Sequence, residues 1–185
     1  RLRARLSSGE VQGACDFTTN GLDIMRFALD VVERAEGPEI LAAFWQAINR
    51  VTILDPTCGS GAFLFAALNV LDPMYDACLG RMAFFLEEWG AEGERDHPQY
   101  HRMFTEALRR VAAHPNHRYF VLKSIIVNNL FGVDIMAEAV EICKLRLFLK
   151  LVAQIERVED LEPLPDIDFN IQTGNTLVGF VSMEE

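Results

Sequence analysis

The residues best placed to do chemistry form one short segment, Asp55-Pro56-Thr57-Cys58-Gly59-Ser60-Gly61. It follows an apolar, β-branched run at 51–54, which we predict to be a buried strand, and it precedes a strongly apolar helix start. Ligands bind at such strand ends in α/β sheets. Gly59 and Gly61 would let the backbone approach a ligand closely, and Asp55 suits an ammonium group better than a pyrophosphate. A plain strand-to-helix turn is the alternative interpretation.

Two further polar positions also follow predicted strands. Asp134 ends the run 130–134, where a carboxylate can accept hydrogen bonds from ribose hydroxyls, and Ile135 could pack on an adenine face. The alternative is that Asp134 caps the following helix. Asn175 closes the alternating segment 167–172, where its amide could reach an adenine edge, although turn statistics alone favour ordinary turn chemistry. The sequence lacks the glycine signatures of dinucleotide and nucleoside-triphosphate sites.

These segments together resemble the motifs of S-adenosylmethionine-dependent DNA amino-methyltransferases. Residues 55–64 resemble motif I, 129–135 resemble motif II and 168–177 resemble motif III. Residues 13–19, followed by a predicted helix, resemble motif X. Motif X placed before motif I is the order of the gamma class of adenine-N6 methyltransferases. The predicted helical insertion and the sequence KLRLFLKLV are most similar to the large methylase subunits of restriction-modification and phage-defence systems.

The resemblance implies a role for each matching position. Thr18 would bind the methionine carboxylate, Asp55 the ammonium group, and Asp134 the ribose hydroxyls. Ile135 would pack on the adenine and Asn175 would meet its amino edge. The full implied set of residues for S-adenosyl-L-methionine is Phe17, Thr18, Asp55, Pro56, Thr57, Cys58, Gly59, Gly61, Asp134, Ile135 and Asn175. Thr19 replaces the proline of motif X, and about 70 residues separate motif I from Asp134, so an insertion must loop out.

The catalytic motif of the family, [Asn/Asp/Ser]-Pro-Pro-aromatic, does not occur in these 185 residues. We therefore assign no catalytic residue. We expect the chain to be the cofactor-binding part of a site-specific DNA adenine-N6 methyltransferase and to be inactive alone. Double-stranded DNA would bind through the missing C-terminal part. Two alternatives stay open: a non-catalytic cofactor-binding or assembly module, and a methyltransferase acting on RNA or protein.

We predict that the elements which position these residues form one α/β domain, residues 1–185. The predicted order is helix, strand, glycine loop, helix, a helical insertion at 75–128, strand, long helix and strand. Alternating strands and helices favour a partial Rossmann-like fold of the class I methyltransferase type, with about three parallel strands. We expect Pro73 to kink or end its helix, 90–96 to be an exposed loop, the helix at 136–157 to be largely buried, and the last strand to lie near an edge.

Composition sets further expectations. Half of the residues are hydrophobic and the formal net charge is −10, so a surface that grips DNA lies mostly elsewhere. We expect a cytoplasmic chain with reduced cysteines, no bound metal, no membrane-spanning segment, and some self-association through an unpaired strand edge. The histidines His97 and His101, and the cations Arg109, Arg110, Arg118 and Lys123, are interpreted as solvated surface rather than as a metal site and a DNA contact.

Overall fold

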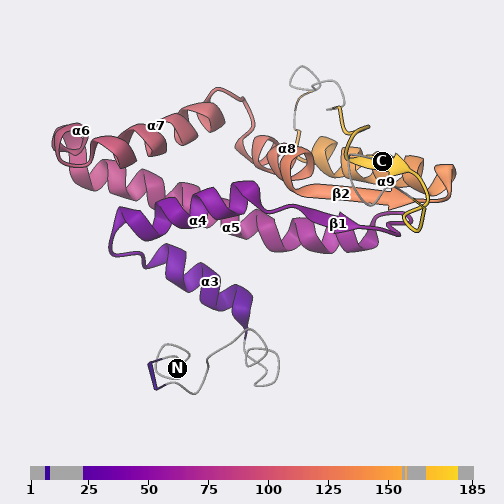
Figure 1. Ribbon diagram of the computed structural model, residues 1–185. Helices are drawn as coiled ribbons and strands as arrows, with labels where there is room; N and C mark the ends of the chain where they lie inside the picture. The colour runs from indigo at the N-terminus through magenta and orange to yellow at the C-terminus, as the bar shows by residue number, and fades with distance from the viewer. Residues whose placement is uncertain (1–6, 9–22, 156, 158–165, 179–185) are drawn as a thin grey trace, which may run out of the picture.

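The computed structural model describes residues 7–8, 23–155, 157 and 166–178 (Figure 1). Motif X, with Phe17 and Thr18, lies outside the described residues. The described elements are α3 (Ile24–Glu33), α4 (Pro38–Arg50), β1 (Ile53–Asp55), α5 (Ala62–Trp89), η1 (Gly90–Glu92), α6 (Gly93–Asp96), α7 (Pro98–Ala112), α8 (His117–Asn129), β2 (Leu130–Asp134), α9 (Ala137–Val152) and β3 (Ile171–Thr173).

The three strands form one parallel sheet in the order β1-β2-β3. Ile53 pairs with Leu130, and Gly132 pairs with Ile171, so all three strands end on the same side of the molecule. This arrangement confirms the predicted helix-rich, partial Rossmann-like α/β fold. Among the described strands β1 and β3 each have one neighbour, and the edge position expected of the last strand is therefore also confirmed.

Helix α5 connects the sheet to the helical part of the molecule, by which we mean the C-terminal half of α5 together with η1, α6, α7 and α8. Its N-terminal half packs on β1 and β2, and its C-terminal half packs on α7 (Figure 1). By length and hydropathy α5 is apolar enough to cross a membrane. Nine of its residues are nevertheless buried against neighbouring elements, as in the core helix of a folded domain. Pro73 does not end this helix, which continues to Trp89 although a proline cannot donate a backbone hydrogen bond.

Two buried asparagines hold the strands to the helices before them. The Asn129 amide donates to the carbonyls of Ile48 (2.8 Å) and Val51 (2.7 Å), which fixes the entry to β1. The Asn170 amide donates to the carbonyls of Val127 (2.9 Å) and Leu130 (3.0 Å), which fixes the entry to β3. Each amide satisfies carbonyls that neither a helix nor the sheet pairs, and in this way the strand ends are placed relative to one another.

Four local expectations are wrong. The last strand does not span 167–172: residues 168–170 form a turn, in which the Asn170 N–H donates to the Ile167 carbonyl, and β3 begins only at Ile171. The strand β1 is only half-buried, since Leu54 is 59% exposed on the face of the sheet that no described helix covers. Helix α9 is not largely buried: four of its residues face the core, while Ile142, Leu145 and Leu149 are exposed. Residues 90–96 form the short helices η1 and α6 rather than a loop, because Gly93 packs beneath Trp89 and His101.

Candidate cofactor site at the strand ends

The three predicted loops meet at the carboxyl ends of the strands. The Cys58 N–H donates to the Val133 carbonyl at 2.9 Å, and the Gly174 N–H donates to the Asp134 carbonyl at 2.9 Å. The Thr176 hydroxyl donates to the Pro56 carbonyl at 3.2 Å, which joins the first loop to the third. Parallel strands bring these segments together although up to 120 positions separate them in the chain.

The glycine loop is a tight turn with two residues in left-handed conformations. The Gly61 N–H donates to the Cys58 carbonyl at 2.8 Å, and φ is +51° at Gly59 and +84° at Gly61. A Cβ atom added at Gly61 would lie 2.5 Å from the Cys143 Sγ, whereas one added at Gly59 would meet nothing within 4 Å. Gly61 therefore allows α9 to pack directly against the loop, and Gly59 leaves the apex of the loop open to a ligand.

Asp134 links the glycine loop to the second strand. Its Oδ2 accepts the Gly59 N–H at 2.8 Å, and its Oδ1 accepts the Met136 N–H at 2.9 Å. These hydrogen bonds, that of Met136 first, lower the pKa of Asp134 below its ordinary value, so the group is a carboxylate at neutral pH. The N-cap of α9 is Met136 rather than Asp134. A carboxylate offers about four acceptor positions, so Asp134 can accept further hydrogen bonds from hydroxyls.

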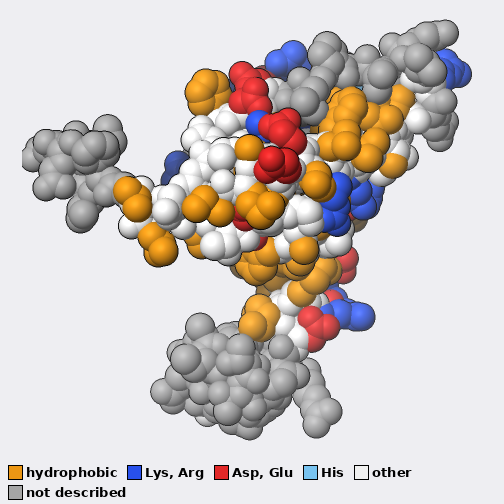
Figure 2. Space-filling model, turned by 90° about the vertical axis from the view of Figure 1, so that its right-hand side faces the viewer, with side chains coloured by type: hydrophobic (Ala, Val, Ile, Leu, Met, Phe, Trp, Pro, Cys, Tyr) orange, Lys and Arg blue, Asp and Glu red, His pale blue; other side chains and the backbone are white. Residues whose placement is uncertain are grey.

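The remaining predicted residues belong to the same three loops at the strand ends. The Asp55 Oδ1 accepts the Thr57 N–H at 3.1 Å, and Ile135 is 70% exposed beside Asp134. The Asn175 Oδ1 accepts the Leu177 N–H at 3.0 Å, which leaves the side-chain NH₂ of Asn175 to donate. Figure 2 views the molecule from the end where the strands terminate, and on this face acidic, basic and hydrophobic side chains lie next to one another. The carboxylates of Asp55 and Asp134, beside the exposed Ile135, suit a ligand that is part cationic and part aromatic.

Two buried thiols pack beneath the loop. Cys58 is 4% exposed, and burial, followed by the charges of Asp134 and Asp55, raises its pKa. Burial raises the pKa of Cys143 to about 12. Both groups are free thiols that remain protonated at neutral pH. Their contribution to the site is packing, because a nucleophilic or metal-binding cysteine requires the thiolate.

Sequence reasoning missed one side chain at the loop. Arg146, on α9, donates from Nη1 to the Ser60 carbonyl at 2.6 Å and to the Ser60 hydroxyl at 3.0 Å. In the sequence Arg146 belongs to a narrow polar stripe with Lys150, Gln154 and Arg157, which indicates a solvent-facing edge of the helix. Only the tertiary arrangement reveals the contact, because 86 positions separate the two residues.

The basic cluster of the helical part is largely paired within the chain. Arg109 and Arg110 both hold Glu106 at 2.9 Å, and Arg118 holds Asp72 at 2.6 Å and Asp76 at 2.8 Å. Within the described ranges, no group of three or more His, Cys, Asp or Glu side chains is arranged to hold a metal ion.

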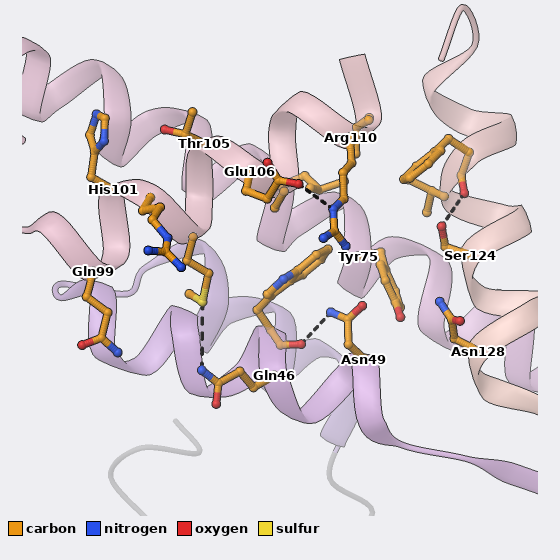
Figure 3. Close-up of a pocket in the computed structure, with 18 of the residues that line it drawn as sticks. Gln46, Asn49, Tyr75, Gln99, His101, Thr105, Glu106, Arg110, Ser124 and Asn128 are labelled. Atoms are coloured by element: carbon orange, nitrogen blue, oxygen red, sulfur yellow. Dashed lines mark hydrogen bonds and ion pairs between the residues drawn. The ribbon is translucent and has the colours of Figure 1, made fainter. Parts of the chain in front are cut away.

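A large hollow lies away from the strand ends. It is a groove of about 1410 Å³ between α4, α7 and α8, and its rim includes Gln46, His101, Arg110 and Asn128 (Figure 3). The predicted cofactor residues do not line it. The groove lies among the helices. The loops at the strand ends are therefore distinguished by their hydrogen bonds and charges rather than by a large cavity.

The fold and the site define an α/β domain of the methyltransferase type, with a glycine loop and an acidic residue at adjacent strand ends. The model of the family "MmeI, DNA-methyltransferase domain" matches residues 31–177, and the chain belongs to this family. It is 37% identical over 151 residues to a Methanocaldococcus jannaschii protein named "Putative type II restriction enzyme and methyltransferase RM.MjaORFECS2P". That match covers 80% of this chain and 10% of the relative. No solved structure matches. The chain is thus a methyltransferase domain related to restriction-modification enzymes.

Proposed function

We propose that this chain binds S-adenosyl-L-methionine at the strand ends. The observation that carries the proposal is the junction of the three loops at Asp134, whose anionic carboxylate keeps acceptor positions beside the open apex at Gly59. Family membership supports it, since methyl transfer needs a methyl donor and the sulfonium methyl of this cofactor is the usual one. The loop residues fit such a molecule, which carries an ammonium group, ribose hydroxyls and an adenine.

Each described residue would hold one part of the cofactor. Asp134 would accept the ribose hydroxyls, and Ile135 would cover an adenine face with its exposed side chain. The Asn175 amide would donate to the adenine edge. Asp55 would stabilise the ammonium group, while the backbone of the 58–61 loop would lie against the methionine portion. Thr18, outside the described residues, keeps its expected role at the carboxylate.

We further propose that the whole protein methylates the N6 atom of adenine in double-stranded DNA. The order of the motifs supports the adenine-N6 class, and the names of the family and of the relative support DNA restriction-modification. The chain spans about a tenth of that relative, so catalysis would need residues beyond the 185 of this chain. Among the described strands β1 pairs on one side only, so its other edge and the exposed Leu54 offer a surface where the remainder of the methyltransferase would pair.

Calorimetric titration with S-adenosylmethionine tests the cofactor proposal. Asp134→Ala should weaken binding by about 1–3 kcal/mol, because charge-assisted hydrogen bonds to the ribose are lost. Glu138→Ala is the matched control, since it removes one carboxylate from the first turn of α9, close to the site. No binding by a folded wild-type chain, or equal losses in the two variants, would contradict the proposal.

The DNA proposal needs the longer protein. Duplex DNA is incubated with that protein and the cofactor, and its nucleosides are then analysed by mass spectrometry for N6-methyladenine. We expect N6-methyladenine in duplex DNA and no methylation of RNA or of protein amides. Methylation of RNA or protein alone would favour the other substrate classes, and cofactor binding without any transfer would favour a non-catalytic module.

A further inference from the structure

Arg146 makes an unusual contact for an exposed arginine. Its guanidinium donates to the Ser60 carbonyl and hydroxyl, and it lies over the Phe65 ring at 4.7 Å from the centroid. In the part of the chain that the structure describes, Arg146 forms no ion pair with a carboxylate. Arg109, Arg110 and Arg118, by contrast, are all paired with acidic side chains. The positive charge on α9 is thus directed at the backbone of the glycine loop.

The contact adds an outside restraint to the 60–61 peptide group, whose N–H is otherwise held only within the loop, by the Cys58 carbonyl. The Cys58 N–H is bonded to β2, and the Gly59 N–H is bonded to Asp134. The next carbonyl, that of Ser60, points to α9 and is held by Arg146. Gly59 sits in open space with a positive φ, so packing alone does not fix the apex. Hydrogen bonds from two sides therefore set the orientation of the peptide groups at 59–61.

The Phe65 ring and the spacing on α9 keep the guanidinium in place. Cys143 and Arg146 are three positions apart on one face of α9, and the Cys143 side chain packs against Gly61. The aromatic face of Phe65, one turn into α5, lies under the guanidinium. The loop is thus clamped between the end of β2 and α9.

We propose that Arg146 is a positioning residue that pre-organises the glycine loop for the methionine portion of the cofactor. This inference rests on the proposed function. A loop that already has its bound conformation loses less conformational entropy when the ligand arrives. The loss of Arg146 should therefore weaken cofactor binding although Arg146 itself does not touch the cofactor. Because the side chain is exposed, its hydrogen bonds contribute little to global stability.

The test compares Arg146→Met and Arg146→Lys with wild type by calorimetric titration with S-adenosylmethionine. We expect Arg146→Met to raise Kd about three- to tenfold with an unchanged melting temperature, and Arg146→Lys to fall between it and wild type, because lysine can still donate to the Ser60 carbonyl. Arg102→Ala, which removes an exposed arginine from α7, is the charge control and should leave Kd unchanged. Equal Kd values for wild type and Arg146→Met would overturn the proposal.

A double-mutant cycle and hydrogen exchange separate positioning from a general structural role. Ser60→Ala should weaken binding less than Arg146→Met, since the carbonyl acceptor remains, and it should add nothing in the Arg146→Met background. Amide exchange at 57–61 should rise in Arg146→Met without a change in the helical part. Additive effects in the cycle, or unchanged exchange, would overturn the proposal. If the wild-type chain binds no cofactor, the function proposed above fails, while the exchange experiment still decides whether Arg146 holds the loop.

Discussion

At the strand ends, hydrogen bonds between residues 40 to 120 positions apart hold the loops together, whereas packed aromatic rings hold the helices between β1 and β2. Trp89 stacks on Phe104 at 5.9 Å, and Phe85 lies 6.2 Å from the same ring. The strand ends expose polar groups, while in the helices between β1 and β2 the arginines Arg109, Arg110 and Arg118 pair with acidic side chains. The strand ends thus keep hydrogen-bond acceptors and donors available to a ligand, whereas the helical part stabilises the fold.

The largest expected effect is a loss of stability in the helical part. Phe104→Ala should destabilise the protein by about 3–5 kcal/mol, because the ring is fully buried among other aromatic rings and leaves a cavity. The loops at the strand ends do not touch it, so Kd for S-adenosylmethionine, measured well below the melting transition, should change less than twofold. Thermal melting followed by circular dichroism gives the stability. A large change in Kd would show that the two regions are coupled through α5.

The next largest effect concerns the glycine loop at 58–61. Gly61→Ala should cost about 2–4 kcal/mol and abolish cofactor binding, because φ is +84° and the new Cβ would meet the Cys143 Sγ. Chemical denaturation and calorimetric titration measure the two effects. Gly59→Ala is the control, since it has the same sign of φ and free space, and it should cost only about 1–2 kcal/mol. In the double variant Gly61→Ala/Cys143→Ala part of the stability should return, and no recovery would show that the backbone conformation alone matters.

The contrast between the regions also explains what the sequence could predict. The periodicity of apolar residues sufficed for β2 and for helices such as α7 and α8, because local burial patterns decide these elements. The motif residues at 55–61, Asp134 and Asn175 meet as expected, since parallel strands bring their ends together. The sequence could not show that α5 continues past Pro73, because packing along this helix outweighs one lost hydrogen bond. It could not show the exposure of α9 either, because an apolar pattern cannot tell which of two apolar faces is covered.

Alkaline pH should lower the stability of both regions, because each contains a buried thiol. Burial raises the pKa of Cys78, in the helical part, and of Cys143, under the loop, to about 12 from an ordinary value of 9.0. Between these values the unfolded chain releases protons that the folded chain keeps. Stability is therefore complete below pH 9 and falls as pH rises towards 12, by up to about 1.4 kcal/mol per pH unit for each thiol.

Single substitutions assign this loss to a region. Cys78→Ala and Cys143→Ala should each flatten the alkaline decline in the free energy of unfolding measured with urea. Hydrogen exchange at pH 9 to 10 should show the helices opening first if Cys78 dominates, and the 58–61 loop opening first if Cys143 dominates. A decline of the same slope in the double variant would contradict the role of both thiols and would point to Tyr75, whose pKa burial also raises to about 12.

The smallest expected effect concerns the surface of the helical part. Glu106 accepts hydrogen bonds from Arg109 and Arg110, and these bonds lower the pKa of Glu106 to about 2. The three side chains are exposed to solvent, which screens their attraction, so Glu106→Gln should leave the melting temperature unchanged within error. The substitution does free two arginines beside the groove, and it therefore sharpens the contrast between the regions. If Arg109 and Arg110 were DNA contacts that Glu106 neutralises, the variant would bind duplex DNA at low salt in a gel-shift assay. We expect no binding, because the net charge of the variant, one unit above the −10 of the chain, still repels phosphates.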